Sequence, residues 1–154
     1  MGARRAVAGL VAVLAVAACG GSPFSPEEYR EAARALARWE ARGFTDYAYE
    51  IRSSCFCPPD LTQWARVEVR GGVVTEVRSV ATGVVLAESL YSMWSPIDEL
   101  FTWLLREHDD DHLVDVRADF DRGLGYPTYI SFGYDSSVMD AGATYYLRNV
   151  VPLD

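Results

Sequence analysis

The sequence predicts a single α+β domain, an antiparallel sheet with two helices packed on one face. Two segments repeat apolar residues at helical spacing, and most of the remaining chain alternates apolar with polar residues as strands do. Short glycine-containing turns separate the alternating stretches, which favours hairpins over the helical crossovers of a parallel sheet. The 154 residues suit one domain of ordinary size, and a chain that is 50% hydrophobic and 23% charged has a globular composition.

Residues 1–19 are expected to form a bacterial lipoprotein signal. Arg4 and Arg5 supply the positive start, and the apolar run over residues 6–18 is too short to span a bilayer comfortably. The run ends in Val-Ala-Ala directly before Cys19. This resembles the site where type II signal peptidase cleaves and the cysteine thiol carries a diacylglycerol. A plain secretory signal, or a short membrane anchor with a chance cysteine, is the less favoured interpretation.

The expected organisation is a signal peptide over residues 1–18, a lipidated cysteine and flexible tether over 19–24, and one α+β domain over 25–154. We therefore expect the protein in the cell envelope, anchored to the membrane and facing the periplasm or the exterior. The membrane is then its first partner, through the N-terminal lipid.

A helix and three strands are predicted in the first half of the domain. Ser25, Pro26 and Glu28 match a capping box with proline in the first turn, and Gly43 is placed to end the helix. Alternating stretches follow, and the glycine pair at positions 71 and 72 suits a two-residue hairpin turn. The predicted strands cover residues 47–57, 65–70 and 73–80, with a short further strand over 84–90.

The second half repeats this order. Ser95 and Pro96 resemble the first helix start, and an apolar stripe follows, formed by Ile97, Leu100, Phe101, Leu104 and Leu105. Three more strands are expected near residues 114–121, 126–134 and 144–151. In the first of these, the inward face is predicted to consist of Val114, Val116, Ala118 and Phe120. The order of helix, three strands, helix, three strands is consistent with tandem α-β-β-β units.

The charge pattern and the missing motifs argue against several classes of function. All 14 positive charges are arginine, and with 22 acidic residues they leave a net charge of −8, which disfavours nucleic-acid binding. A chain without lysine has neither a Schiff-base lysine nor a P-loop lysine. The sequence has no GxSxG and no GxGxxG motif. It also lacks HExxH, because Asp109 rather than glutamate follows His108. We predict no catalytic set, no cofactor and no metal site.

Cys55 and Cys57 are the most distinctive local feature. On an extended strand their Cα atoms would lie about 6.6 Å apart on the apolar face, near the upper limit for a disulfide. Pro58 and Pro59 end the strand and can supply the bend that a disulfide needs. In an oxidising compartment, with Cys19 taken by lipid, we expect a structural disulfide. Two buried thiols or a redox-active dithiol are the alternatives, and a zinc site is a weak case.

Two further groups of residues are candidate sites. The acidic stretch Asp109–Asp111, with Asp115, Asp119 and Asp121, has the carboxylates of a Ca²⁺ site but not the EF-hand pattern. A solvated loop and an outward strand face explain it better. Four aromatic residues suit a sugar- or peptide-binding surface, although packing is the commoner use of such residues in strands. They are Trp64, Trp94, Tyr126 and Tyr129.

Several motifs together resemble a known bacterial family. They are Tyr47-x-Tyr49, Cys55-Phe56-Cys57-Pro58, Val67-x-Val69-x-Gly71-Gly72-Val73-Val74, Gly125-Tyr126-Pro127-x-x-Ile130 and Asp140. The pattern is similar to the domain-of-unknown-function family 6174, found in small exported proteins and lipoproteins, and extends over roughly residues 35–150. Ala141 and Gly142 stand where the family usually has an acidic residue after Asp140. The resemblance implies an exported domain but no mechanism, since the family has no established activity.

Three hypotheses of function follow. The leading one is a non-catalytic binding or accessory module of the cell envelope, with an envelope protein as a possible partner. The second is a thiol–disulfide protein that uses Cys55 and Cys57. The third is a divalent-cation-binding lipoprotein that uses the acidic cluster between Asp109 and Asp121.

Overall fold

The computed structural model describes residues 23–106, 112–138 and 142–154. Its elements are α1 (Pro26–Glu40), β1 (Tyr47–Ser54), α2 (Pro59–Thr62), β2 (Ala65–Arg70), β3 (Val73–Ser79), the 3-10 helix η1 (Glu88–Met93), α3 (Ile97–Leu105), β4 (Leu113–Phe120), β5 (Pro127–Tyr134) and β6 (Ala143–Pro152). The predicted signal peptide, Cys19, Asp109–Asp111 and Asp140 lie outside the described residues.

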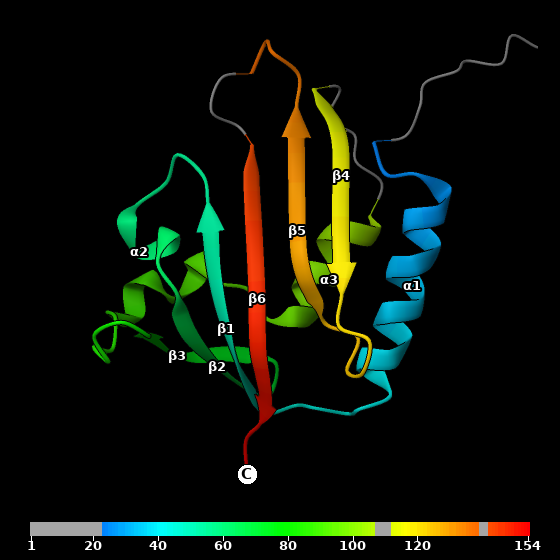
Figure 1. The fold of residues 1–154 in the computed structure, drawn as a ribbon. Helices are drawn as coiled ribbons and strands as arrows, with labels where there is room; N and C mark the ends of the chain where they lie inside the picture. Colours follow the sequence, from blue (N-terminus) through cyan, green and yellow to red (C-terminus); the bar gives the residue numbers. More distant parts are fainter. Residues whose placement is uncertain (1–22, 107–111, 139–141) are drawn as a thin grey trace, which may run out of the picture.

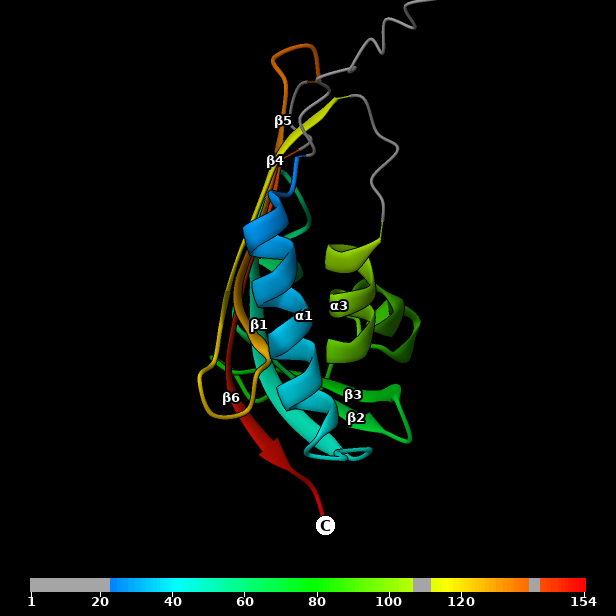
Figure 2. The same ribbon diagram turned by 90° about the vertical axis from the view of Figure 1, so that its right-hand side faces the viewer.

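The strands form one six-stranded antiparallel sheet in the order β3-β2-β1-β6-β5-β4 (Figure 1). Helices α1 and α3 lie on the same face of this sheet and contact each other (Figure 2). The α+β prediction is therefore confirmed. The predicted order of two helix-plus-three-strand units is also observed, but β1 is a central strand and β4 an edge strand. The strands of each unit nevertheless have the same internal order, β3-β2-β1 followed by β6-β5-β4.

The start of α1 follows the predicted capping box. The Ser25 hydroxyl accepts from the Glu28 N–H at 3.3 Å, and the Glu28 carboxylate accepts from the Ser25 N–H at 3.0 Å. The helix ends at Glu40 and buries Ala32, Ala35 and Trp39. Just before it, the Pro23 carbonyl accepts from the Val116 N–H at 2.9 Å, which ties the beginning of the described chain to β4.

Gly125 lies where α1 comes closest to the loop between β4 and β5. Its φ of 91° is in the left-handed region, which disfavours other residues. A Cβ at this position would lie 2.4 Å from the Ala35 carbonyl oxygen and 2.9 Å from the Trp39 nitrogen. Glycine therefore allows the helix backbone to pack directly on this loop, and Tyr126 and Pro127 continue the chain as buried residues.

The start of α3 differs from the prediction. The residue that caps the helix is Pro96, with no side-chain cap from Ser95. Instead, the Tyr47 hydroxyl accepts from the Ile97 N–H at 2.9 Å, and the Tyr49 hydroxyl donates to the Ser95 carbonyl. Proline has no N–H to offer, so the first free N–H of the helix is satisfied from β1. Burial raises the pKa of both tyrosines well above the ordinary value.

Two predicted strand features are wrong. Residues 84–90 do not form a strand: only Val85 makes a bridge, to Arg78, and the chain then turns into η1, which packs on β3. In β4 the inward residue is Leu113, while Val114 is 55% exposed. The pairing with β5 shifts register between Leu113 and Asp115, so a bulge reverses the alternation at the start of the strand.

Leu104→Ala should lower the free energy of unfolding by about 2–5 kcal/mol, because Leu104 is 0% exposed and truncation leaves a cavity. The matched control is Val114→Ala, which removes an exposed side chain and should change this free energy by less than about 0.5 kcal/mol. Urea denaturation followed by circular dichroism measures both. Equal losses would place Val114 in the core and contradict the bulge.

Tyr47→Phe should lower the free energy of unfolding by about 1–3 kcal/mol, because it leaves the buried Ile97 N–H without its partner.

Tyr47→Phe should also make the free energy of unfolding less dependent on pH in the alkaline range. Unfolded tyrosine ionises near pH 10, while burial raises the pKa of Tyr47 in the folded state, so its contribution is complete below about pH 10 and is lost as the pH rises further. Unfolding measured at neutral and alkaline pH tests this, with Tyr129→Phe as the control. Parallel pH profiles for wild type and Tyr47→Phe would refute it.

Candidate functional site

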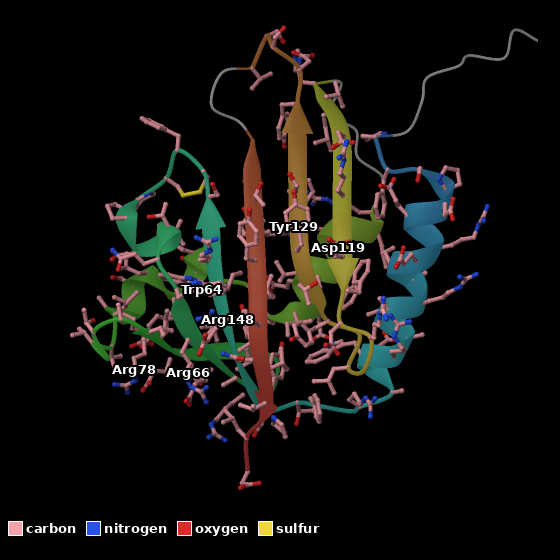
Figure 3. The ribbon with its side chains drawn as sticks, viewed as in Figure 1. Trp64, Arg66, Arg78, Asp119, Tyr129 and Arg148 are labelled. Carbon is pink, nitrogen blue, oxygen red and sulfur yellow. A yellow bond between two sulfur atoms is a disulfide. The ribbon has the colours of Figure 1, made fainter. Side chains whose placement is uncertain are left out.

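The face of the sheet opposite α1 and α3, named here the open face, carries charged and aromatic side chains from every strand (Figure 3). The strand register arranges them in two cross-strand rows. One row consists of Arg78, Arg66, Glu50 and Arg148, and the other of Arg52, Tyr146, Tyr129 and Asp119. This face thus brings together side chains from segments that are far apart in the sequence.

Five of these side chains form an arginine–aromatic cluster, made of Trp64, Arg148, Arg52, Tyr146 and Tyr129. The guanidinium carbons of Arg148 and Arg52 lie 3.9 Å and 5.4 Å from the centre of the Trp64 ring. Arg52 also lies 4.7 Å from the centre of the Tyr146 ring, and Tyr146 packs edge-on against Tyr129 at 5.6 Å. Such contacts hold guanidinium groups in fixed planes on aromatic faces.

The charges around the cluster are not evenly balanced. Glu50, whose side chain is 15% exposed, accepts from Nε of Arg148 at 2.8 Å. The neighbouring arginines of the open face are each paired: Arg66 with Glu68, Arg78 with Glu76, and Arg117 with Asp115. Within the described residues, Arg52 has no carboxylate at ion-pair distance. Of the two guanidinium groups on the Trp64 ring, only that of Arg148 therefore has an acidic partner in the described part of the chain.

The four aromatic residues proposed from the sequence divide between core and surface. Trp94 and Tyr126 are 5% and 8% exposed and belong to the hydrophobic core. Trp64 and Tyr129 lie on the open face (Figure 3). Arg52, Tyr146 and Arg148 were not among the site residues predicted from the sequence. Strand alternation alone could place Arg52 outward, but the pairing that brings β6 beside β1 has no local signal.

Cys55 and Cys57 form a pair just beyond the end of β1. Their Cα atoms are 5.3 Å apart, closer than the extended spacing, because the strand ends at Ser54 and the chain bends before α2. The predicted bend is thus present, although neither cysteine lies in the strand itself. Phe56 between them is 88% exposed. The pair therefore holds an aromatic side chain out from the sheet at a tight turn.

The described members of the acidic cluster have separate roles. Asp115 pairs with Arg117 at 2.9 Å, and Asp121 accepts from the N–H groups of Gly123 and Leu124 in the turn after β4. Asp119 lies on the open face (Figure 3). Among residues 23–106, 112–138 and 142–154, no group of three or more His, Cys, Asp or Glu side chains is placed to hold a metal ion.

A serine, a histidine and an aspartate also meet at the end of β5. Asp135 Oδ2 and Ser137 Oγ each lie 3.1 Å from the same ring nitrogen, Nδ1 of His112, and the Ser137 hydroxyl donates to Asp135. These hydrogen bonds, first from Ser137 and then from His112, lower the pKa of Asp135 to about 2. A nucleophilic triad needs the acid and the serine on opposite ring nitrogens, so this cluster orders a turn instead.

A groove between α1 and α3 is a further concave feature of the described residues. Its lining residues are Leu36, Glu40, Asp98, Phe101, Thr102, Leu105 and Arg106. Two of its polar groups are already engaged: Asp98 accepts from Trp39 Nε1 at 3.1 Å, and the Thr102 hydroxyl donates to the Asp98 carbonyl at 3.0 Å. Because these groups are engaged in bonds within and between the helices, the open face is the stronger candidate.

The fold and this face define a single-sheet α+β domain with one helix-covered side and one polar, aromatic side. The chain belongs to the DUF6174 family, a family of unknown function, whose model matches residues 31–152. This confirms the family that the sequence motifs indicated. No curated protein and no solved structure matches the chain. None of the helices in the described part is long and apolar enough to cross a membrane.

We expect Cys55 and Cys57 to be oxidised to each other in the mature protein. Maleimide labelling under denaturing, non-reducing conditions should leave both unlabelled, and prior reduction should expose both. Replacing the pair with serine should keep the fold, at a cost of roughly one or two kcal/mol, because the closed loop is very short. Full labelling without reductant would show free thiols and contradict the disulfide.

Proposed function

We propose that this protein is a non-catalytic binding module of the bacterial cell envelope, held to the membrane by lipid on Cys19, and that it binds through the open face. The arginine–aromatic cluster is the observation that carries the proposal. Arginine and large aromatic residues dominate the energetics of binding surfaces, because they combine fixed planar groups with a large contact area. Here both kinds of residue meet on a sheet face that α1 and α3 leave uncovered.

The attachment of the domain to its N-terminal segment supports an anchored module. The Pro23 carbonyl is bonded to β4, and Cys19 is four residues earlier in the chain. An extended chain covers at most about 3.6 Å per residue, so a lipid on Cys19 would lie within roughly 14 Å of Pro23. An anchored domain would therefore stay at the membrane surface, and its ligand would be a component of the same envelope.

The described chemistry favours binding over catalysis. The Ser137–His112–Asp135 group has the geometry of an ordered turn, and two polar groups of the helix groove, those of Asp98 and Thr102, are engaged in structural hydrogen bonds. On the described part of the open face the polar groups include guanidinium, carboxylate, phenol and the hydroxyls of Ser131 and Thr144, which lie 3.3 Å from each other. The guanidinium groups and rings recognise charge and flat ligands, and neither of these two hydroxyls is hydrogen-bonded to a base among the described residues.

Site-specific photo-cross-linking tests the proposal in living cells that express the full chain. A photoreactive benzoylphenylalanine in place of Tyr129 should give a discrete adduct, because Tyr129 belongs to the cluster. The same group in place of Tyr29, which is 48% exposed on α1, is the matched control and should give none. Cys19→Ala should move the protein out of the membrane fraction and weaken the Tyr129 adduct.

Two outcomes would contradict the proposal. Equal adducts from positions 29 and 129, or none from 129, would remove the open face as a binding surface. Unchanged membrane fractionation of Cys19→Ala, checked by intact mass, would remove the lipid anchor.

A further inference from the structure

We propose that the open face binds an acidic oligosaccharide, with a sugar carboxylate held by Arg52 and Arg148 and the sugar rings laid across the row that ends at Asp119. This inference rests on the proposed function and deepens it by naming the class of ligand. It is carried by an incompletely neutralised pair of guanidinium groups and by the row of side chains that leads away from them.

The carboxylate site is formed where two arginines share the Trp64 ring. Arg148 gives its Nε to Glu50, and its terminal nitrogens have no hydrogen-bond partner among the described residues. Arg52 contacts the same ring and has no carboxylate at ion-pair distance in that part of the chain. One positive charge therefore stays unmatched in a protein whose net charge is −8. A planar, fork-shaped donor of this kind complements a carboxylate.

The position for the sugar rings follows from the strand register. Arg52 lies beside Tyr146, Tyr146 beside Tyr129, and Tyr129 beside Asp119, so one side chain from each of β1, β6, β5 and β4 forms a straight row. Neighbouring strands are about 4.8 Å apart, which makes the row roughly 14 Å long. This length suits a short oligosaccharide, whose C–H faces pack on aromatic rings and whose hydroxyls bond to phenols.

Asp119 provides the opposite end of the row. Its carboxylate has neither an ion pair nor a side-chain hydrogen bond with the described residues. An ionised carboxylate only accepts hydrogen bonds, so it suits the hydroxyl groups of a neutral part of the ligand and repels a second acidic group. The row therefore has a direction, with the acidic group of the ligand at Arg52 and a hydroxyl-bearing ring at Asp119.

An extended peptide is the less suitable ligand for this row. Peptides that add to a sheet do so along an edge strand, where unpaired main-chain groups are available. Three of the four strands that the row crosses, β1, β6 and β5, are central, and their main-chain groups are engaged in the antiparallel ladder on both sides; only its last member, Asp119, lies on the edge strand β4. Recognition must then come from side chains that face a ligand lying flat on the sheet, which a stiff chain of sugar rings can do.

Calorimetric titration of the purified full-chain protein tests the proposal with three probes: aldotriouronic acid (glucuronosyl-xylobiose, which has one carboxylate at one end), xylotriose and triglutamate. Aldotriouronic acid should bind, and the neutral xylotriose should bind at least tenfold more weakly. Arg52→Gln should weaken the binding of aldotriouronic acid at least tenfold, as should Trp64→Ala. Arg117→Gln is the matched control, because Arg117 lies on the same face but is paired with Asp115, and it should keep wild-type affinity. Melting temperatures show whether each variant is folded.

Four results would overturn the inference. They are no binding of aldotriouronic acid at millimolar concentration, equal affinity for xylotriose, equal or stronger binding of triglutamate, and equal losses in Arg52→Gln and Arg117→Gln. The last would show only a general effect of charge. If a variant fails to fold, Tyr129→Ala gives the same test from the other end of the row. If any of these results is found together with a protein adduct from position 129, the sugar ligand is refuted while the proposed binding module is still supported.

Discussion

The arrangement of the whole domain depends on two buried hydroxyl groups in its central strand. The Tyr47 hydroxyl accepts a hydrogen bond from the first free N–H of α3, that of Ile97. The Tyr49 hydroxyl donates a hydrogen bond to the carbonyl of Ser95, just before the helix. Buried polar groups without partners are costly, so these two bonds determine where the second helix crosses the sheet. Trp39 of α1 then bonds to Asp98, which joins the two helices on that face. With both helices held there, the other face is left open.

A second constraint acts at the opposite side of the helix layer. The contact between Gly125 and the backbone of α1 is so close that a Cβ would overlap the Ala35 carbonyl. The Gly-Tyr-Pro motif therefore has a physical meaning: the glycine admits the helix, and the two following residues enter the core at the start of β5. This contact fixes how closely α1 packs on the loop between β4 and β5, and the tyrosines of β1 fix where α3 begins over the sheet.

The features that could be predicted from sequence are those with a local signal. The capping box at Ser25, the stripe around Leu104 and the hairpin at residues 71 and 72 each depend on neighbouring residues, and each is observed. The features that could not be predicted depend on distant partners. Ser95 does not cap α3 because Tyr47, far away in sequence, satisfies its first N–H. Val114 turns outward because the pairing of β4 with β5 contains a bulge.

The candidate site has the same division between local and distant causes. Trp64 and Tyr129 were identifiable as aromatic residues near strands, but the meeting of Arg52 with Arg148 depends on the pairing of β1 with the last strand of the chain. Once that pairing exists, the surrounding ion pairs show where charge on the open face is matched and where it is not. Arg66, Arg78 and Arg117 are each neutralised by a near neighbour on their own strand, so most of the open face carries no local excess of charge. Stacking on Trp64 stabilises both arginines, but it leaves the charge of Arg52 without a carboxylate in the described part of the chain. The negatively charged ligand proposed above would complete the charge balance at this point.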